Sequence, residues 1–217
     1  GERQDERMQA VAIATQLDYY YFQGTNEDSV IHYTNKVKEF AKATHQPKYY
    51  YFAWANRLIT YYLKTSRTNI ALYEVQNMLK EAQEEDDKTG LSRCYNIMSQ
   101  IYTIKRFDSM AFEWRLKEIE LTEKYKIENY NISQTYAQIA NYYINQKKQK
   151  EALAAVEKAI ATANSSTQQI SAKLEFVNYY SKFGDFQAAE KLLKECQAAF
   201  EQDKRLESIK KRLYNIE

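Results

Sequence analysis

The sequence predicts an all-α fold made of consecutive helical hairpins. The first observation is composition, because 217 residues include only 4 glycines and 1 proline, too few for the many turns of a sheet-rich fold. The second is that apolar residues recur at helical spacing along most of the chain. The third is that this pattern returns with a period near 40 residues, which indicates a repeat architecture.

Five tyrosines in equivalent positions define the period. They are separated by 41, 40, 41 and 37 residues along the chain. These tyrosines are Tyr21, Tyr62, Tyr102, Tyr143 and Tyr180. We expect five helix–turn–helix repeats and a terminal helix, because a repeat array stacks similar units in sequence order. The predicted repeats are 5–45, 46–87, 88–127, 129–166 and 167–203, with the terminal helix at 204–217. We expect them to form a single superhelical domain, 1–217, within a larger protein.

The fourth and fifth repeats follow the pattern most closely. In the fourth repeat, Ala140 lies in the first helix, and Ala152 and Ala159 lie on one face of the second. These small residues let the two helices approach closely. In the fifth repeat, Gly184 is suited to the positive φ that ends a helix, and Asp185 is suited to capping the next one. These two repeats therefore define the pattern of small and apolar positions with which the other repeats are compared, and we call this pattern the repeat frame.

The third repeat departs from this frame in its second helix. Arg115 and Glu118 stand where small or apolar residues are expected. The apolar stripe of this helix moves to Phe112, Leu116 and Ile119. We therefore expect these three apolar residues to face the core.

The units resemble tetratricopeptide repeats (TPRs), and Ala152 and Ala189 in the second helices favour this family. The usual TPR period is about 34 residues, so the helices here are expected to be about one turn longer. An armadillo- or HEAT-like array, with a period of about 40–47 residues, is the alternative. The resemblance implies a right-handed α-solenoid whose first helices line a concave groove that binds extended peptides.

The resemblance also indicates which side chains would meet a peptide. In family members that clamp a peptide carboxylate, an asparagine follows the small residue of the first helix. Asn141 and Asn178 hold this place in the fourth and fifth repeats, and Gln100 holds it in the third. An asparagine amide both donates and accepts hydrogen bonds, so these side chains are predicted to form a polar ladder along a peptide backbone.

Three further asparagines, Asn145, Asn96 and Asn56, are expected to project toward the same groove. The clamp pattern also has a lysine one turn earlier, where this chain has Ala137 and Leu174. This difference argues against a true carboxylate clamp. The alternative is that the asparagines are ordinary solvated residues on a polar helix face.

Two runs of four aromatic residues stand out, at 19–22 and at 49–52. Successive residues of an α-helix turn by about 100°, so four neighbours cannot share one face. Some of these rings are therefore expected to reach the surface, where they are candidates for apolar contact with a partner. Packing between long helices is the alternative.

No residue pattern in the sequence indicates catalysis, a cofactor or a metal ion. His32 and His45 are 13 residues apart, which is about 20 Å along a helix and too far to share a metal. The motifs of P-loops, zinc proteases and serine hydrolases are absent from the sequence. Cys94 and Cys196 are expected to be buried free thiols, because distant positions in a repeat array rarely touch. We therefore predict a protein that is not an enzyme, with no catalytic, cofactor-binding or metal-binding residues.

Charge and hydropathy limit the partners that the sequence predicts. The net charge is +2, with acidic and basic residues interspersed, so a phosphate-binding basic stripe is missing and nucleic acid is not expected as a partner. No apolar run approaches the roughly 20 residues of a membrane-spanning helix, so direct membrane insertion by this segment is not expected. A protein or peptide ligand in the concave groove is the predicted partner.

Low proline content, a Lys/Asn/Tyr/Ile-rich composition and long repeats resemble the sensor regions of Bacteroidetes-type membrane-anchored histidine kinases and regulators. This resemblance implies the sensor or interaction region of a bacterial signalling protein of a two-component system, located in the periplasm. One alternative is a fragment of a cytoplasmic, peptide-sensing transcriptional regulator. Another is a structural adaptor that acts by homodimerisation.

Overall fold

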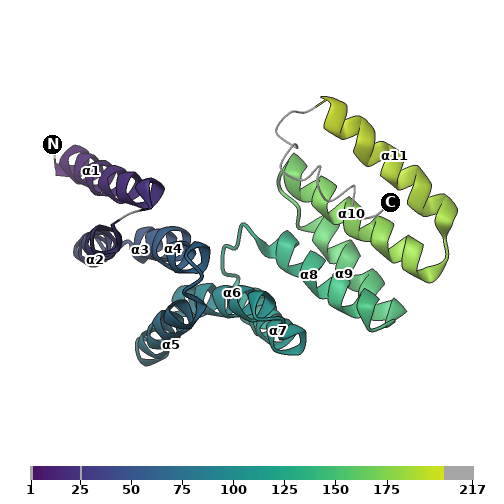
Figure 1. The fold of residues 1–217 in the computed structure, drawn as a ribbon, viewed down its shortest axis with the longest axis horizontal. Coiled ribbons are helices and arrows are strands. Elements are labelled where there is room, and N and C mark those ends of the chain that lie inside the picture. The colour runs from purple at the N-terminus through teal and green to yellow at the C-terminus, as the bar shows by residue number, and fades with distance from the viewer. Residues whose placement is uncertain (1, 25, 203–217) are drawn as a thin grey trace. The chain divides into compact units, whose positions relative to one another are not determined.

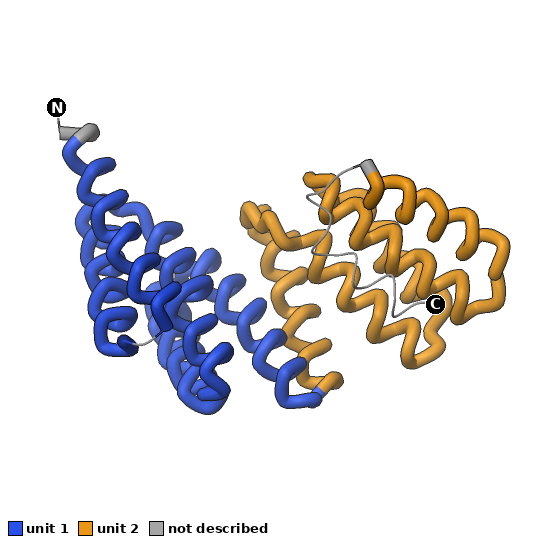
Figure 2. Tube along the Cα trace, turned by 45° about the horizontal axis from the view of Figure 1, so that its top comes forward, with its two compact units in different colours: residues 1–107 blue, residues 108–217 orange. Residues whose placement is uncertain are grey.

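Every regular element in the part of the chain that the structure describes is a helix (Figure 1). The structure is a computed structural model that describes residues 2–24 and 26–202. The prediction of an all-α fold is confirmed, whereas the terminal helix predicted at 204–217 lies outside the described residues. The chain divides into two compact units, residues 1–107 and 108–217 (Figure 2). That these units form a single superhelical domain stays a prediction.

Unit 1 consists of short-linked helices that pack on their neighbours in sequence. Its elements are α1 (Glu2–Gln23), α2 (Glu27–Ala43), α3 (Pro47–Ala53), η1 (Trp54–Ile59), α4 (Thr60–Lys64), α5 (Thr68–Glu84) and α6 (Lys88–Ile104). Because α3, η1 and α4 follow one another without a break, they form one helix with a π-helical turn at η1. α1 packs on α2, α2 packs on α3 and η1, and α5 packs on α6. First helices of adjacent hairpins also touch, since α1 contacts η1 and α3 contacts α6.

Unit 2 repeats this arrangement. Its elements are α7 (Asp108–Tyr125), α8 (Ile132–Asn145), α9 (Gln149–Ala161), α10 (Ser166–Phe183) and α11 (Phe186–Gln202). α8 packs on α9, and α10 packs on α11. α10 also contacts both α8 and α9, so the two hairpins stack side by side. α7 packs on α8.

Four of the five anchoring tyrosines mark the ends of first helices. In each case the tyrosine carbonyl oxygen accepts a hydrogen bond from the backbone N–H five residues later, at 2.8–2.9 Å. This bond belongs to the Schellman pattern that ends helices. The four residues are Tyr62, Tyr102, Tyr143 and Tyr180. The first repeat differs, because there the N–H of Gly24 donates to the carbonyl oxygen of Tyr20 at 3.2 Å.

Most of these turns place an ordinary residue in the left-handed conformation. Ser66, Arg106 and Lys147 have φ angles of 60°, 62° and 57°, each at a cost of about 1 kcal/mol. In the fifth repeat Gly184 takes this place, with a φ of 92°. Asp185 then caps α11, since its Oδ1 accepts a backbone N–H of that helix at 3.0 Å. The predictions for Gly184 and Asp185 are therefore confirmed.

The small residues of the repeat frame lie in the core of unit 2. Ala140, Ala152 and Ala159 are fully buried, and they belong to one apolar cluster with Tyr136 and Val156. Without bulk at these positions, α8 and α9 approach closely while the larger side chains fill the space beside them. The expected role of the three alanines is confirmed.

The apolar stripe predicted for α7 is wrong in part. Ile119 is buried, but Leu116 is 40% exposed. Instead, Arg115 and Glu118 are buried, at 7% and 1% exposure, together with Ala111 on the same face. The repeat frame, rather than the hydropathy of single residues, decides which face of α7 turns inward.

Candidate functional site

A polar face on the neighbouring helices α8 and α10 carries three of the predicted site residues. Asn141 Nδ2 on α8 donates to Glu175 Oε2 on α10 at 3.3 Å. Asn178 Nδ2 donates to the same oxygen at 3.0 Å. The carboxylate of Glu175 therefore joins two asparagines that hold equivalent places in successive repeats.

Asn145 extends this face by one helical turn. Its Nδ2 donates to Asn141 Oδ1 at 3.1 Å, and its side chain is exposed, while Asn141 and Asn178 are half-buried. Each amide has two N–H donors and a carbonyl oxygen that can accept twice. The bonds within the cluster use only part of that capacity, so the amides can also bind a peptide backbone.

The residues one turn before the two asparagines face the core. Ala137 is 3% exposed and Leu174 is fully buried. A lysine at either position would have to bring its ammonium group into the apolar interior, which is costly. This placement agrees with the expectation that the face is not a carboxylate clamp.

The other three predicted residues lie in unit 1. Asn96 and Gln100 are paired on α6, where Gln100 Nε2 donates to Asn96 Oδ1 at 2.7 Å. Asn56 lies in η1 and is half-buried. Its backbone carbonyl oxygen accepts from Arg57 Nη1 at 3.1 Å. The structure thus brings Asn141, Asn145 and Asn178 together, and it separately pairs Asn96 with Gln100.

The sequence-based prediction missed Glu175. This residue is 4% exposed and holds the α8–α10 face together through one carboxylate oxygen. The signal was present, because Glu175 precedes Asn178 by three residues and therefore lies one turn away on the same helix face. What the sequence could not show is the bond across to Asn141 on another helix.

A buried charged group on α7 supports the neighbouring part of α8. Arg115 Nε donates to Gln138 Oε1 at 2.8 Å, and Gln138 lies one turn before Asn141. Burial lowers the pKa of Arg115, an effect opposed by the negative charges of Glu118 and Asp108. Glu118 Oε1 in turn accepts from Asn129 Nδ2 at 2.8 Å. The bond from Arg115 therefore orients the side chain of Gln138, one helical turn before Asn141.

Among residues 2–24 and 26–202, no group of three or more histidine, cysteine, aspartate or glutamate side chains is placed to hold a metal ion. Within the same ranges, each helix is too short or too polar to cross a membrane.

Comparison with solved structures shows the fold. BtubC (BKLC) from P. vanneervenii has a TM-score of 0.60 and 14% identity over 90% of this chain and 92% of its own. A Podosopora anserina putative kinesin light chain with nearly identical TPR-like repeats has a TM-score of 0.57 and 14% identity, over 89% and 94%. Pseudomonas aeruginosa pilF has a TM-score of 0.54 and 12% identity, over 96% and 99%.

No protein-family model matches the sequence, and no curated protein matches it either. At identities of 12% and 14% the structural likeness concerns the fold alone. It confirms the prediction of a solenoid of TPR-like helical hairpins.

Proposed function

We propose that this chain is a non-catalytic repeat module that binds a protein or an extended peptide through the asparagine face of α8 and α10. The observation that carries the proposal is the bridge through Glu175. It holds the amides of Asn141 and Asn178, from equivalent places in two successive repeats, at one acceptor. Amides that recur once in each repeat suit a ligand whose hydrogen-bonding groups also recur at regular intervals.

An extended peptide is such a ligand. Each of its residues except proline presents one N–H donor and one carbonyl acceptor, and an asparagine amide can bind both. The polar groups that face solvent here are neutral amides, while the carboxylate of Glu175 is 4% exposed. This arrangement favours backbone groups over phosphate or a terminal carboxylate, which would be bound by cationic side chains.

The finer role that we propose is the sensor or interaction region of a bacterial signalling protein, in the periplasm. Its support is the composition and the long repeat period, which resemble the ectodomains of membrane-anchored histidine kinases. A sensor of this type needs no catalytic group of its own, since a bound partner passes its signal to an effector elsewhere in the protein. The natural sequence after residue 217 tests this role, because a membrane-spanning segment is expected there. A natural sequence without such a segment would refute the role as a periplasmic sensor.

The binding proposal is tested by selecting phage-displayed 12-residue peptides on the full chain and measuring their affinity by fluorescence polarisation. Asn145→Ala removes an exposed amide of the face, so it should weaken the selected peptides about five- to tenfold, as expected for one lost hydrogen bond of about 1 kcal/mol. Asn164→Ala is the matched control, because Asn164 is also exposed but lies in the turn between α9 and α10.

Two outcomes would count against the proposal. One is that no peptide is enriched over several rounds. The other is that Asn145→Ala and Asn164→Ala weaken binding equally, which would show that the asparagine face is an ordinary solvated surface.

A further inference from the structure

A small apolar pocket in unit 1 lies between α1, α2 and the helix that contains η1. Its volume is about 130 Å³. An apolar cavity of about 150 Å³ takes up one benzene molecule, so this pocket has room for one aromatic ring or one branched aliphatic side chain. Its lining includes Ala14, Leu17, Val37, Phe40, Phe52 and Arg57. We call it the Arg57 pocket.

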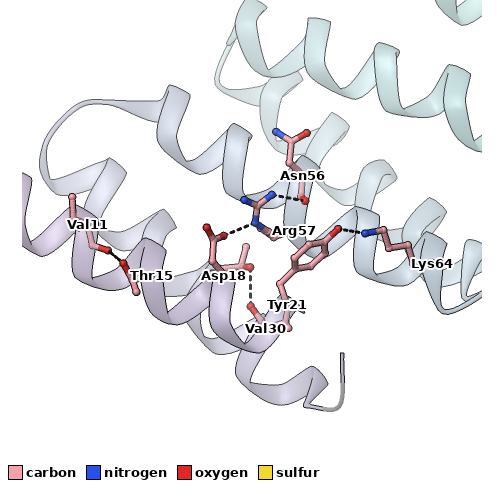
Figure 3. A network of polar contacts seen from close by, with 9 residues as sticks. Val11, Thr15, Asp18, Tyr21, Val30, Asn56, Arg57 and Lys64 are labelled. Carbon is pink, nitrogen blue, oxygen red and sulfur yellow. Dashed lines mark hydrogen bonds and ion pairs between the residues drawn. The ribbon is translucent and has the colours of Figure 1, made fainter. Parts of the chain in front are cut away.

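An ion pair between Asp18 and Arg57 (Figure 3) forms a polar part of the lining of the Arg57 pocket. Arg57 Nε donates to Asp18 Oδ1 at 2.5 Å, and both residues line the pocket. The Asp18 side chain is 45% exposed and that of Arg57 is 20% exposed, so both can be reached from solvent. Arg57 also donates from Nη1 to the backbone carbonyl oxygen of Asn56 (Figure 3).

Three aromatic rings hold the Arg57 guanidinium in place. Its Cζ atom lies 5.0 Å from the ring centroid of Tyr21, 5.7 Å from that of Phe22 and 5.8 Å from that of Phe52. A guanidinium is attracted to aromatic rings at these distances. The orientation of its donors is therefore set before any ligand arrives.

The π-helical turn explains why Arg57 reaches Phe52. In an α-helix, residues five apart point about 140° away from each other. The wider π turn, with its i→i+5 bonds, brings such residues onto one side. Thr60 Oγ1, which donates to the carbonyl oxygen of Ala55 at 2.9 Å, follows the same five-residue spacing. Single π turns occur frequently at functional sites.

The two aromatic runs meet at the guanidinium of Arg57, which lines this pocket. Tyr49 and Phe52 line it and are 44% and 56% exposed, and Phe22 beside Arg57 is 73% exposed. Neighbouring Tyr21 and Tyr51 are buried, at 8% and 6%. The runs therefore divide between core and surface, as the helical geometry requires, and two surface members of the second run line the cavity.

We propose that the Arg57 pocket binds one bulky apolar side chain of a peptide, while Asp18 and Arg57 form hydrogen bonds with the backbone amides on either side of that residue. A guanidinium has five N–H donors, of which two are accounted for by Asp18 and Asn56. The remaining ones suit a peptide carbonyl, and the second oxygen of Asp18 suits a peptide N–H. The balanced ion pair favours a neutral amide, since a carboxylate ligand would meet Asp18 and an amine would meet Arg57.

This anchor pocket is separate from the asparagine face of unit 2, and it has its own test. The probe is N-acetyl-phenylalaninamide, one apolar side chain between two neutral amides, titrated into the ¹⁵N-labelled full chain and followed by NMR. Ala14→Leu fills the pocket from an exposed position of α1, and Ala12→Leu makes the same change at an exposed position that is not part of the lining.

We expect saturable shifts at the pocket residues, at least a tenfold weaker dissociation constant in Ala14→Leu, and an unchanged one in Ala12→Leu. Asn145→Ala should also leave binding of the probe unchanged, which separates this inference from the proposed function.

Three results would overturn it: no saturable shifts at the pocket, equal binding of N-acetylglycinamide, or equal binding of phenylacetate. The second would mean that the cavity is not used, and the third that the ion pair does not select neutral amides.

Discussion

Because Asn141 and Asn178 share Glu175 as an acceptor, replacing both asparagines should lower the free energy of unfolding by more than the sum of the two single replacements. Glu175 is 4% exposed, so its carboxylate depends on protein donors. The bond from Asn178 is 3.0 Å long and that from Asn141 is 3.3 Å, slightly beyond the usual range for N–H···O bonds. Hydrogen bonds to charged groups contribute about 1.5–3 kcal/mol. We therefore expect Asn178→Ala to cost about 1.5 kcal/mol and Asn141→Ala about 1 kcal/mol.

The double variant Asn141→Ala/Asn178→Ala should cost more than the two single changes together. Each single change leaves Glu175 Oε2 one of these two donors, whereas the double change removes both of them from a buried carboxylate. The coupling expected between contacting residues of one network is about 1 kcal/mol, so the double variant should lose about 3–4 kcal/mol. Adding Glu175→Gln should recover part of this loss, because a neutral amide costs less to bury than a carboxylate.

Urea unfolding, followed by circular dichroism, measures this cycle through shifts of the midpoint at unchanged slope. Asn145→Ala is the control: its side chain is exposed and donates to Asn141, so its effect should stay below about 0.5 kcal/mol. Strict additivity of the two single changes, or a cost for Asn178→Ala as small as that of the control, would refute the role assigned to Glu175.

Two further predictions concern unit 1. Alanine normally favours helices, but Gly90→Ala should destabilise the protein by about 1–3 kcal/mol through overpacking, because the new Cβ would lie 2.5 Å from Tyr51 Oη. In urea unfolding, adding Tyr51→Phe should relieve part of this loss. A gain in stability for Gly90→Ala would contradict the packing. Burial, reinforced by the charges of Asp87 and Glu81, raises the pKa of Cys94 to about 12. The native thiol thus keeps its proton above about pH 8.5, where an unfolded thiol ionises, and stability should fall as the pH rises from there toward 12. Cys94→Ala should lose less stability over this pH range, and an equal alkaline loss in both proteins would contradict the prediction.

The hairpins could be predicted from the sequence because their signals are local. The tyrosine period coincides with helix ends, since Tyr62, Tyr102, Tyr143 and Tyr180 accept the bonds of the closing turns. Side-chain caps and helical spacing act within a few residues. Local rules of this kind located Gly184 without any knowledge of tertiary contacts.

The inward-facing side of α7 shows where local sequence signals fail to predict burial. Judged by hydropathy, Leu116 should be inside and Arg115 outside, and the structure has the reverse. Arg115 can be buried because a partner on another helix, Gln138, accepts from its Nε. That partner lies 23 residues away in sequence, so no pattern within α7 could reveal it.

The same distinction divides the candidate sites. The sequence by itself determined the all-α hairpins and the asparagines in equivalent places of successive repeats, because both depend on helical periodicity. Only the tertiary structure decided that Asn141 and Asn178 share Glu175, and that a π turn sets Arg57 over Phe52 beside an apolar pocket. The physical reason is that bonds across helices and cavities between them depend on how distant segments pack.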